Sequence, residues 1–364
     1  MRKLASVQVV KNIRDVENSD NLQVVDILGF TIVINKKENI KINDLVVYLE
    51  TDSVLPEKPE FEFLRPRKHR VRICKFRKQI SEGLIFPLSI LPEVRSSWKE
   101  GEDVTELLGV TQYITPQEEE VIERLPKNKF LKKLCRYKFF RNILLEKNIK
   151  CDYPKHLIHR SDLDRIQTMP DAFEKHFKGT SGWSVTEKVE GTNSCNILNT
   201  ETKKYFKVFK RTKKEFYVCS HNNHLKTKHR CWYWDNAIKQ SIKEKLLKVP
   251  YDVGIIGEII GTSIQKNYYQ LPDKDYYIFT VKNLSENRYF SNEEVLKFCE
   301  EYGFKMVPTV DSNYTIPETI QELVEFSDGY SKINPKLLRE GIVLRKGVHS
   351  FKVINPKYLL KNDL

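Results

Sequence analysis

Short apolar runs alternate with polar segments over residues 1–112. The runs are rich in Val, Ile and Leu, and segments at 18–21 and 36–39, rich in Asn, Asp and Lys, interrupt them. Runs of this length between turn residues predict β-strands. We expect the strands to fall within residues 5–13, 22–35, 44–50 and 71–74.

About five short strands in about 100 residues predict a small Greek-key barrel of the OB type. A strongly basic stretch at 63–72 falls outside most of these runs and would form a loop. Such a loop either lines a groove that follows a nucleic-acid backbone or is a solvated loop without a partner. The sequence leaves both interpretations open.

A different pattern covers residues 113–152. An acidic segment at 117–123 precedes residues 127–150, in which nine Lys or Arg accompany a single acid, Glu146. Apolar residues between 130 and 144 recur at near-helical spacing, which predicts a helical linker with an apolar stripe. Its basic remainder is either a nucleic-acid face or a solvated one.

Strands and helices mix from residue 153 to the end. Amphipathic stretches at 292–302 and 319–327 predict helices. Apolar runs predict strands at 184–187, 205–210, 216–220, 254–260, 276–281, 341–345 and 351–354. The expected fold class is therefore α+β, with an N-terminal OB-like β-barrel domain (1–112), a basic helical linker (113–152) and a larger mixed domain (153–364).

The charge balance favours a polyanionic partner. The chain carries 62 Lys and Arg against 49 Asp and Glu, a formal net charge of +13. Neutralising phosphates supplies most non-specific affinity for nucleic acid. A lysine-rich composition alone would give the same excess, so charge does not decide the matter.

The cysteine content and the hydropathy of the chain indicate the compartment in which the protein works. Seven cysteines without a Cys-x-x-Cys pair indicate free thiols and an intracellular, reducing compartment, either cytoplasmic or nuclear. No run of about 18 apolar residues is present, so we expect no membrane span. The basic start alternates like a strand and lacks the apolar block of a signal peptide.

Candidate chemistry begins at Lys188, in the segment Thr-Glu-Lys-Val-Glu-Gly-Thr-Asn at 186–193. A lysine that attacks phosphorus must be partly deprotonated near neutral pH, which desolvation or neighbouring cations can achieve. Gly191 would let the backbone approach a phosphate closely. Alone, this short pattern is weak, because most such matches are surface loops.

Five further segments follow along the chain. They are Val-Cys-Ser-His-Asn at 218–222, Gly-Glu-Ile-Ile-Gly at 257–261, Tyr-Ile-Phe-Thr-Val at 277–281, Glu-Gly-Ile-Val-Leu-Arg at 340–345 and Ser-Phe-Lys-Val-Ile at 350–354. Together with the Lys188 segment they resemble, in order and spacing, the motifs of the lysine nucleotidyltransferase superfamily of RNA ligases, DNA ligases and mRNA-capping enzymes. The resemblance covers residues 153–364 and implies an ATP-grasp-like nucleotidyltransferase domain built on antiparallel sheets with flanking helices.

The resemblance also implies roles for single residues. Lys188 would be the nucleophile, and Lys352 would contact the α-phosphate and offset charge in the transition state. Glu258 would accept hydrogen bonds from the ribose hydroxyls of ATP, and Phe279 would stack on adenine. Glu187 would also lie at the nucleotide.

Two further groups of residues complete the implied site. Glu190 and Glu340 would position Mg²⁺ or Mn²⁺, and Ser220, His221 and Asn222 would contact nucleic acid. Residues 159–167 resemble a segment that precedes the nucleophile in RNA ligases with an N-terminal OB-like domain, the Naegleria/Deinococcus type. Arg165 within it would contact phosphate or nucleotide, since a guanidinium binds phosphate oxygens bidentately.

Three departures from the family pattern bear on these roles. His221 stands where Arg is common, Ile354 stands where many members have a second lysine, and Glu190 replaces the more usual Asp. A competing zinc site, from Cys219, His221, His224, His229 and Cys231, matches no common zinc spacing.

The order of the domains separates the candidate functions. DNA ligases and capping enzymes usually carry their OB domain after the last motif, whereas here the OB-like part comes first and only residues 353–364 follow Lys352. The resemblance therefore favours an ATP-dependent RNA ligase that seals 5′-phosphate and 3′-hydroxyl ends through lysyl-AMP. The alternatives are a DNA ligase or an inactive nucleic-acid-binding relative.

The expected partner is RNA as a nicked or end-containing duplex, with mixed RNA and DNA also open, and the expected state is a monomer. We expect the OB-like domain and the linker to hold this nucleic acid, and so to matter more for sealing than for lysine adenylylation.

Overall fold

The computed structural model describes residues 3–92, 97–113, 150–205, 209–226 and 231–362. The chain forms two compact units. The first comprises Met1–Thr115, Leu163–Lys188 and Val310–Leu364, and the second comprises Pro116–Asp162 and Val189–Thr309. Most of the predicted helical linker lies outside the described residues, and its last three residues, Lys150–Asp152, are strand β11 rather than helix.

The N-terminal part of the first unit is built from short antiparallel strands, as predicted. Its β-sheets pair in the orders β1-β5-β9, β2-β3-β4, β7-β8 and β6-β10. The bounds are β1 Ala5–Val9, β2 Asn12–Asp15, β3 Leu22–Ile27, β4 Phe30–Asn35, β5 Leu45–Leu49, β6 Ser53–Val54, β7 Cys74–Phe76, β8 Gln79–Ser81, β9 Leu84–Pro87 and β10 Thr111–Gln112.

Two details of this barrel differ from the sequence prediction. The run at 22–35 is two strands, because the chain turns at Leu28, which has a positive φ of 54°. The basic stretch begins inside a 3-10 helix, Pro59–Arg67, which buries Phe61 and Leu64. Apolar residues of β1 and β5 pack with that helix and with α1 (Thr105–Leu108) in one core cluster.

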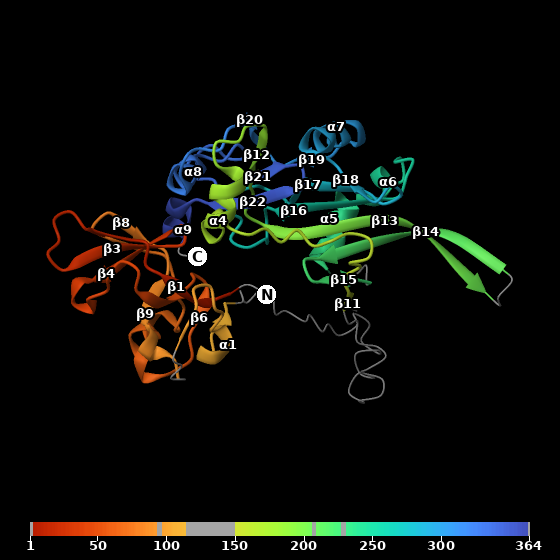
Figure 1. Cartoon of the computed structure of the whole chain (residues 1–364). Helices are drawn as coiled ribbons and strands as arrows, with labels where there is room; N and C mark the ends of the chain where they lie inside the picture. Colours follow the sequence, from red (N-terminus) through yellow and green to blue (C-terminus); the bar gives the residue numbers. More distant parts are fainter. Residues whose placement is uncertain (1–2, 93–96, 114–149, 206–208, 227–230, 363–364) are drawn as a thin grey trace, which may run out of the picture. The chain divides into compact units, whose positions relative to one another are not determined.

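The rest of the first unit is a four-stranded antiparallel sheet in the order β20-β12-β21-β22. Its strands are β12 Trp183–Lys188, β20 Thr309–Tyr314, β21 Gly341–Lys346 and β22 His349–Ile354, and helices α8 (Ile320–Ser327) and α9 (Pro356–Asn362) follow β20 and β22 (Figure 1). The rings of Phe177, Trp183 and Phe351 pack together with centroids 5.2–5.4 Å apart, and this cluster anchors one face of the sheet.

A larger sheet forms the second unit, in the order β11-β15-β14-β13-β16-β17-β18, with β19 beside β17. All neighbours are antiparallel except β17 and β19. The bounds are β13 Thr192–Tyr205, β14 Phe209–Ser220, β15 Asn223–Leu225, β16 Val253–Ile260, β17 Asp275–Asn283, β18 Arg288–Tyr289 and β19 Lys305–Met306.

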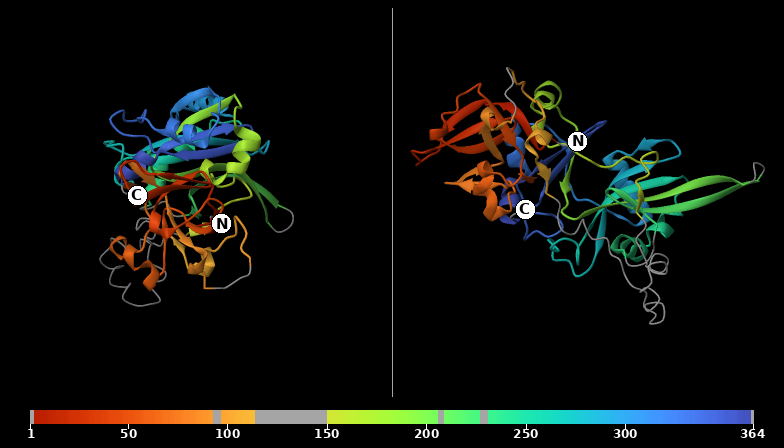
Figure 2. Two further views of the ribbon diagram at one scale, coloured as in Figure 1. Left: turned by 60° about the vertical axis from the view of Figure 1, so that its left-hand side comes forward. Right: turned by 90° about the horizontal axis from the view of Figure 1, so that it is seen from below.

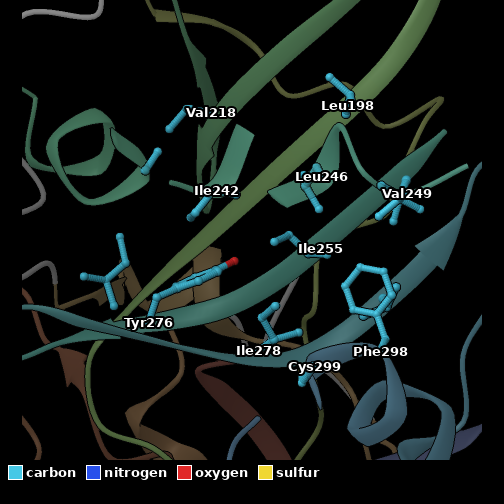
Figure 3. Packing of buried hydrophobic residues seen from close by; sticks show 14 of the residues in the cluster. Leu198, Val218, Ile242, Leu246, Val249, Ile255, Tyr276, Ile278, Phe298 and Cys299 are labelled. Atoms are coloured by element: carbon cyan, nitrogen blue, oxygen red, sulfur yellow. The ribbon is translucent and has the colours of Figure 1, made fainter. Parts of the chain in front are cut away.

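Three helices cover one face of this sheet, namely α5 (Trp232–Lys239), α6 (Ile242–Leu246) and α7 (Asn292–Tyr302). Figure 3 shows the resulting core, in which Ile242 and Phe298 lie against the strand residues Leu198, Ile255 and Ile278. The opposite face carries a smaller cluster that includes Cys195, Ile197 and Ile256. The two faces of the sheet therefore have different surroundings.

The helix starts follow local sequence signals. Ser291 accepts a hydrogen bond from the Glu294 amide at 3.2 Å, and the Glu294 carboxylate accepts one from the Ser291 amide at 2.7 Å. This reciprocal capping begins α7, and Thr319 and Glu322 repeat it at α8. Among the described residues, no helix is long and apolar enough to span a membrane.

Candidate active site

In the first unit, strand alternation puts several motif residues on one face of the four-stranded sheet. Lys188 ends β12 and pairs with Gly341 of β21, and Thr186 pairs with Val343, which in turn pairs with Lys352 of β22. Residues that are paired, or two apart along a strand, share a face. Lys188 and Lys352 therefore lie on the same face, two strands apart.

Glu340 lies directly before β21 and forms an ion pair with the Lys188 ammonium through Oε1. The side chains of Lys188 and Glu340 are 27% and 13% exposed, so the pair is largely shielded from water. The other carboxylate oxygen of Glu340, Oε2, is buried and accepts no hydrogen bond from the described residues. A buried carboxylate oxygen without a donor is costly, which indicates a site for a further cationic or hydrogen-bonding group.

Arg165 lies beside Lys352. The two residues form a parallel β-bridge, and the Lys352 amide donates to the Asp164 carbonyl at 2.9 Å. The Arg165 guanidinium donates to Thr51 Oγ1 at 3.4 Å, so a barrel residue holds it. The barrel contacts the same segment at Gly29, whose amide donates to the Gln167 carbonyl at 2.8 Å, and an added Cβ there would lie 2.7 Å from Gln167 Cα.

Glu187 is placed apart from these residues. It is adjacent to Lys188 on β12, so its side chain points to the opposite face of the sheet. It is 2% exposed and accepts a hydrogen bond from the Lys332 amide at 2.8 Å, and burial raises the pKa of its carboxyl. The carboxylate therefore holds the segment around Lys332, on the face of the sheet opposite Lys188.

In the second unit, Glu258 and Phe279 lie on the face opposite the helices. Glu258 is half-buried and pairs across the sheet with Asn193 and Tyr277. The register between β16 and β17 shifts between Ile256, which pairs with Thr280, and Gly257, which pairs with Ile278, so Phe279 is the extra residue of a β-bulge. Bulges redirect a side chain, and this half-buried ring packs on the cluster around Cys195.

Gly191 serves a packing role that the sequence did not reveal. A Cβ at this position would lie 2.5 Å from the Ile259 carbonyl oxygen and 2.8 Å from Glu258 Cγ. Only glycine lets the chain after the nucleophile segment approach β16 this closely. Next to it, the Glu190 amide donates to the hydroxyl of buried Tyr269 at 2.9 Å.

Ser220, His221 and Asn222 form the turn between β14 and β15. Ser220 Oγ accepts from the Asn223 amide at 3.1 Å, and His221 Nε2 lies 3.1 Å from an Asp162 oxygen. Asn222 is exposed. A neighbouring carboxylate weakens the case for His221 as a phosphate contact, since it competes with an anion for the imidazole.

The zinc interpretation is wrong for the part of that cluster that is described. Cys219 is fully buried beside Cys195, and its hydrogen bond to that residue and its burial raise the pKa of its thiol. Cys231 packs instead in the cluster on the helix-covered face. Within the described residues, no group of three His, Cys, Asp or Glu is arranged to hold a metal, and His229 lies outside them.

The expected magnesium or manganese fits a different donor set. Mg²⁺ and related hard cations bind through one or two carboxylates, with waters and substrate phosphates as the other ligands. Glu340, with its buried oxygen without a donor, supplies such a ligand. The second expected ligand, Glu190, is half-buried in the short connection between β12 and β13.

Several residues that shape the site were absent from the sequence prediction. Arg165 is contacted by Thr51 and lies near Glu82, and Glu190 is contacted by Tyr269. The side-chain amide of Asn193 donates to Ser161 Oγ at 3.0 Å. Near Ile354, Lys357 pairs with Asp328 at 2.6 Å. No periodicity marks such contacts, although Asn193 stands in the nucleophile segment itself.

Comparison with known proteins agrees with this arrangement of domains. Residues 181–354 match the family model described as RNA ligase, and residues 4–88 match a model described as an OB-fold domain. No curated protein sequence matches the chain.

Solved structures of a Naegleria gruberi enzyme are similar over the whole chain. The Naegleria gruberi RNA ligase with PPi is 26% identical, with a TM-score of 0.78 over 100% of this chain and 99% of that one. A mutant of that ligase with ATP and Mn is 25% identical, with a TM-score of 0.79 and full coverage of both chains. A mutant with AMP and Mn is 26% identical, with a TM-score of 0.77 over 99% of each chain.

The fold and the order of the domains are those of a nucleotidyltransferase domain with an OB-fold domain in front. Residues 181–354 carry the domain that the RNA ligase family model describes, and the whole chain has the fold of the Naegleria gruberi RNA ligase.

One consequence of this architecture concerns the pH dependence of stability. Glu82 of the barrel is 5% exposed, and burial raises the pKa of its carboxyl from 4.5 to about 7, although the positive charge of Arg165 opposes the shift. Below pH 4.5 both folded and unfolded states are protonated. Between pH 4.5 and about pH 7, Glu82 loses its proton in the unfolded state but keeps it in the folded state. The free energy of unfolding therefore falls across this pH range, by about 3 kcal/mol in total above pH 7.

We therefore expect Glu82→Gln to be more stable than the unsubstituted protein at pH 8, with the difference shrinking as the pH falls to 5. Urea denaturation at both pH values measures it. Glu57→Gln, at a more exposed position of the same domain, is the control and should show no such trend. A stability difference that does not change with pH would contradict the burial of an uncharged Glu82.

Proposed function

We propose that the protein is an ATP-dependent RNA ligase that joins 5′-phosphate and 3′-hydroxyl ends through a covalent lysyl-AMP intermediate. The observation that carries the proposal is the shared face of the β12-β21-β22 sheet, where Lys188 meets Glu340 and where Lys352 lies beside Arg165. A lysine nucleophile, an acid and two cations are the groups that transfer of a nucleotidyl group to lysine requires.

In the first step the neutral amine of Lys188 attacks the α-phosphorus of ATP. An N–P bond forms, the bond from the α-phosphorus to the bridging oxygen breaks, and pyrophosphate leaves. An ion-paired ammonium is not a nucleophile, so the pair with Glu340 must open and Lys188 must lose a proton first. Lys352 and Arg165 offset negative charge on the α-phosphate as it becomes pentavalent.

Nucleotide recognition falls to residues of the second unit. Glu258 accepts hydrogen bonds from the ribose hydroxyls, since a carboxylate with two acceptor oxygens suits a cis-diol. Phe279, turned out of the regular strand register by its bulge, stacks on the adenine. Both residues lie on the face that the helices leave uncovered, which supports this assignment.

Glu340 and Glu190 would hold a divalent cation, which supplies neutralisation of phosphate charge when it is bound. Structures of the Naegleria gruberi ligase with ATP and Mn support the same pairing of nucleotide and metal here. Glu190 is one methylene longer than the Asp common in the family, and Tyr269 fixes its backbone.

The two later steps act on nucleic acid. AMP passes from Lys188 to the 5′-phosphate, and the 3′-hydroxyl then attacks the activated phosphorus, so that AMP leaves. We propose that the functional division follows residues 1–112, 113–152 and 153–364, with the barrel and the linker holding the RNA. Ser220, His221 and Asn222 are further candidates for contact with it. The six described cysteines are free, which suits a reducing compartment.

Lysine adenylylation is the first test. On incubation with α-labelled ATP and Mg²⁺ or Mn²⁺, the protein should carry label through a denaturing gel, and Lys188→Ala should carry none because the attacking amine is gone. Lys336→Ala, an exposed lysine of the same unit, is the matched control and should label normally. Label that persists in Lys188→Ala would rule out this nucleophile.

Stacking by Phe279 gives a second expectation. Removing an aromatic ring from a base costs about 1–3 kcal/mol, so Phe279→Ala should raise the KM for ATP about 5- to 150-fold. Phe279→Tyr keeps the ring and should stay close to the unsubstituted enzyme. Initial rates of adenylylation across ATP concentrations measure this, and equal KM values for the Ala and Tyr variants would exclude stacking.

Sealing of matched nicks tests the substrate. We expect ligation when the strand that ends in the 3′-hydroxyl is RNA, because RNA ligases act on such ends, and weak or no ligation when that strand is DNA. Gel assays on four nicked duplexes, with RNA or DNA on each side, give the answer. Preferential sealing of all-DNA nicks would favour the DNA ligase alternative, and adenylylation without any sealing would favour an impaired relative.

A further inference from the structure

Strands β13 and β14 continue far beyond the sheet that contains them. β13 pairs with β16 only from Thr192 to Leu198, whereas its pairing with β14 continues to Tyr205 opposite Phe209. The seven residues after Leu198 extend the two strands by about 23 Å at about 3.3 Å per residue. Both views in Figure 2, like Figure 1, show this two-stranded ribbon projecting from the sheet.

The two faces of the ribbon differ in charge. Directly paired residues share a face, and the register pairs Thr200 with Lys214 and Thr202 with Thr212 on one of them. The same register pairs Asn199 with Glu215 and Glu201 with Lys213 on the other face, and it continues there toward the tip with Lys203 opposite Arg211 and Tyr205 opposite Phe209. We call the first of these the Thr/Lys face; among its residues between 200 and 214 whose side chains are described, none is acidic.

Acids lie beside Lys213 on the other face, whereas the described side chains of the Thr/Lys face between 200 and 214 include no acid. Lys213 pairs with Glu215 at 3.0 Å, and Glu201 accepts a hydrogen bond from Tyr217. Within the described residues, Lys214 has no ion-pair partner and is exposed. The only acid that contacts a described Thr/Lys-face side chain is Asp252, which accepts from Thr200 at the base of the ribbon.

Hydroxyl and ammonium groups without aromatic rings suit one kind of ligand. Thr202 and Thr212 lie with their hydroxyl oxygens 3.2 Å apart, both exposed, and the register continues toward the tip with Lys204 opposite Lys210. Such groups bind phosphate oxygens and carry no sequence information, whereas binding of unpaired bases relies on aromatic stacking. The net charge of +13 favours the same partner.

We propose that the Thr/Lys face of the ribbon, with Thr202, Thr212 and Lys214 as its described contacts, binds the phosphate backbone of duplex RNA away from the ends being joined. The proposal rests on the proposed RNA ligase function and adds a contact surface to it. A duplex is the occupant because it presents phosphates outward and hides its bases from a face that has no described ring.

Strand alternation places the Thr/Lys face away from the residues that would bind the nucleotide. Thr200 and Thr202 continue the face of β13 that carries Leu198, which packs in the helix-covered core. Glu258 and Phe279 lie on the opposite face of the same sheet. A duplex bound on the Thr/Lys face therefore lies on the side of the sheet opposite the nucleotide-binding residues. Only a long duplex can reach both the Thr/Lys face and the nucleotide-binding residues.

The test compares two neighbouring lysines on opposite faces. Lys214→Ala should weaken binding of a long nicked RNA duplex about three- to tenfold and reduce the slope of log affinity against log salt by about 1, measured by fluorescence anisotropy. Lys213→Ala removes the same charge from the other face, where Lys213 is paired with Glu215, and should change neither quantity. Thr212→Glu should weaken binding at least as much as Lys214→Ala, by repulsion.

Assays of adenylylation, and of sealing on short and long duplexes, separate a loss of duplex binding from a loss of catalysis. Lys214→Ala should adenylylate Lys188 normally and seal a short nicked duplex normally, with a raised KM only for the long one. Equal losses in Lys213→Ala and Lys214→Ala, equal losses on short and long duplexes, or an equal loss on single-stranded RNA would each overturn the proposal.

The two proposals fail in different ways. If the unsubstituted protein does not adenylylate, the ligase function fails, while the anisotropy comparison still decides whether the ribbon binds duplex RNA. If adenylylation and sealing occur but Lys214→Ala binds long duplex as the unsubstituted protein does, only the ribbon proposal fails.

Discussion

The ion pair between Lys188 and Glu340 joins the end of β12 to the residue just before β21, at the position where Lys188 pairs with Gly341. Because the period of side chains along a strand is two, this one pairing fixes which face of the sheet each motif residue occupies. It puts Lys352 on the face of Lys188 and Glu187 on the other. A slip of one residue would reverse these placements and separate the nucleophile from the cation that faces the same phosphate.

The same constraint governs the second unit, with one local exception. Regular alternation puts Glu258 on the face that the helices leave open, and the buried Ile255 and Ile278 on the face they cover. The exception is in β17, where the bulge adds Phe279, so that two residues instead of one lie between Ile278 and Val281, both of which face the helices. The sheet thus has a structural side and a chemical side, and the β13–β14 ribbon carries both sides outward beyond the helices.

Much of this could be predicted from the sequence, because strands and motif order are local properties. The apolar runs around 254–260, 276–281 and 341–345 became strands, and the helices at 292–302 and 320–327 begin at capping pairs visible in the sequence. The placement of Glu187 was also accessible, since adjacent residues of a strand point to opposite faces. Strand geometry alone puts the side chain of Glu187 on the face opposite Lys188.

Other features depend on contacts between distant segments and leave no local trace. The support of Arg165 by Thr51, more than 100 residues away, and the approach of Gly191 to Ile259 arise only on folding. The length of the β13–β14 ribbon could not be predicted from the sequence either. An exposed two-stranded extension lacks the apolar alternation that marks a packed strand. These contacts turn a set of ordered motifs into a candidate active site.

The most direct test of this account is to locate the nucleotide on the chain. After incubation with ATP and Mn²⁺, the protein would be digested under conditions that preserve a phosphoramidate, and tandem mass spectrometry would identify the modified peptide. We expect AMP on the peptide that contains Lys188, bonded to its side-chain nitrogen. AMP on Lys352 or on any other residue, with Lys188 unmodified, would contradict it.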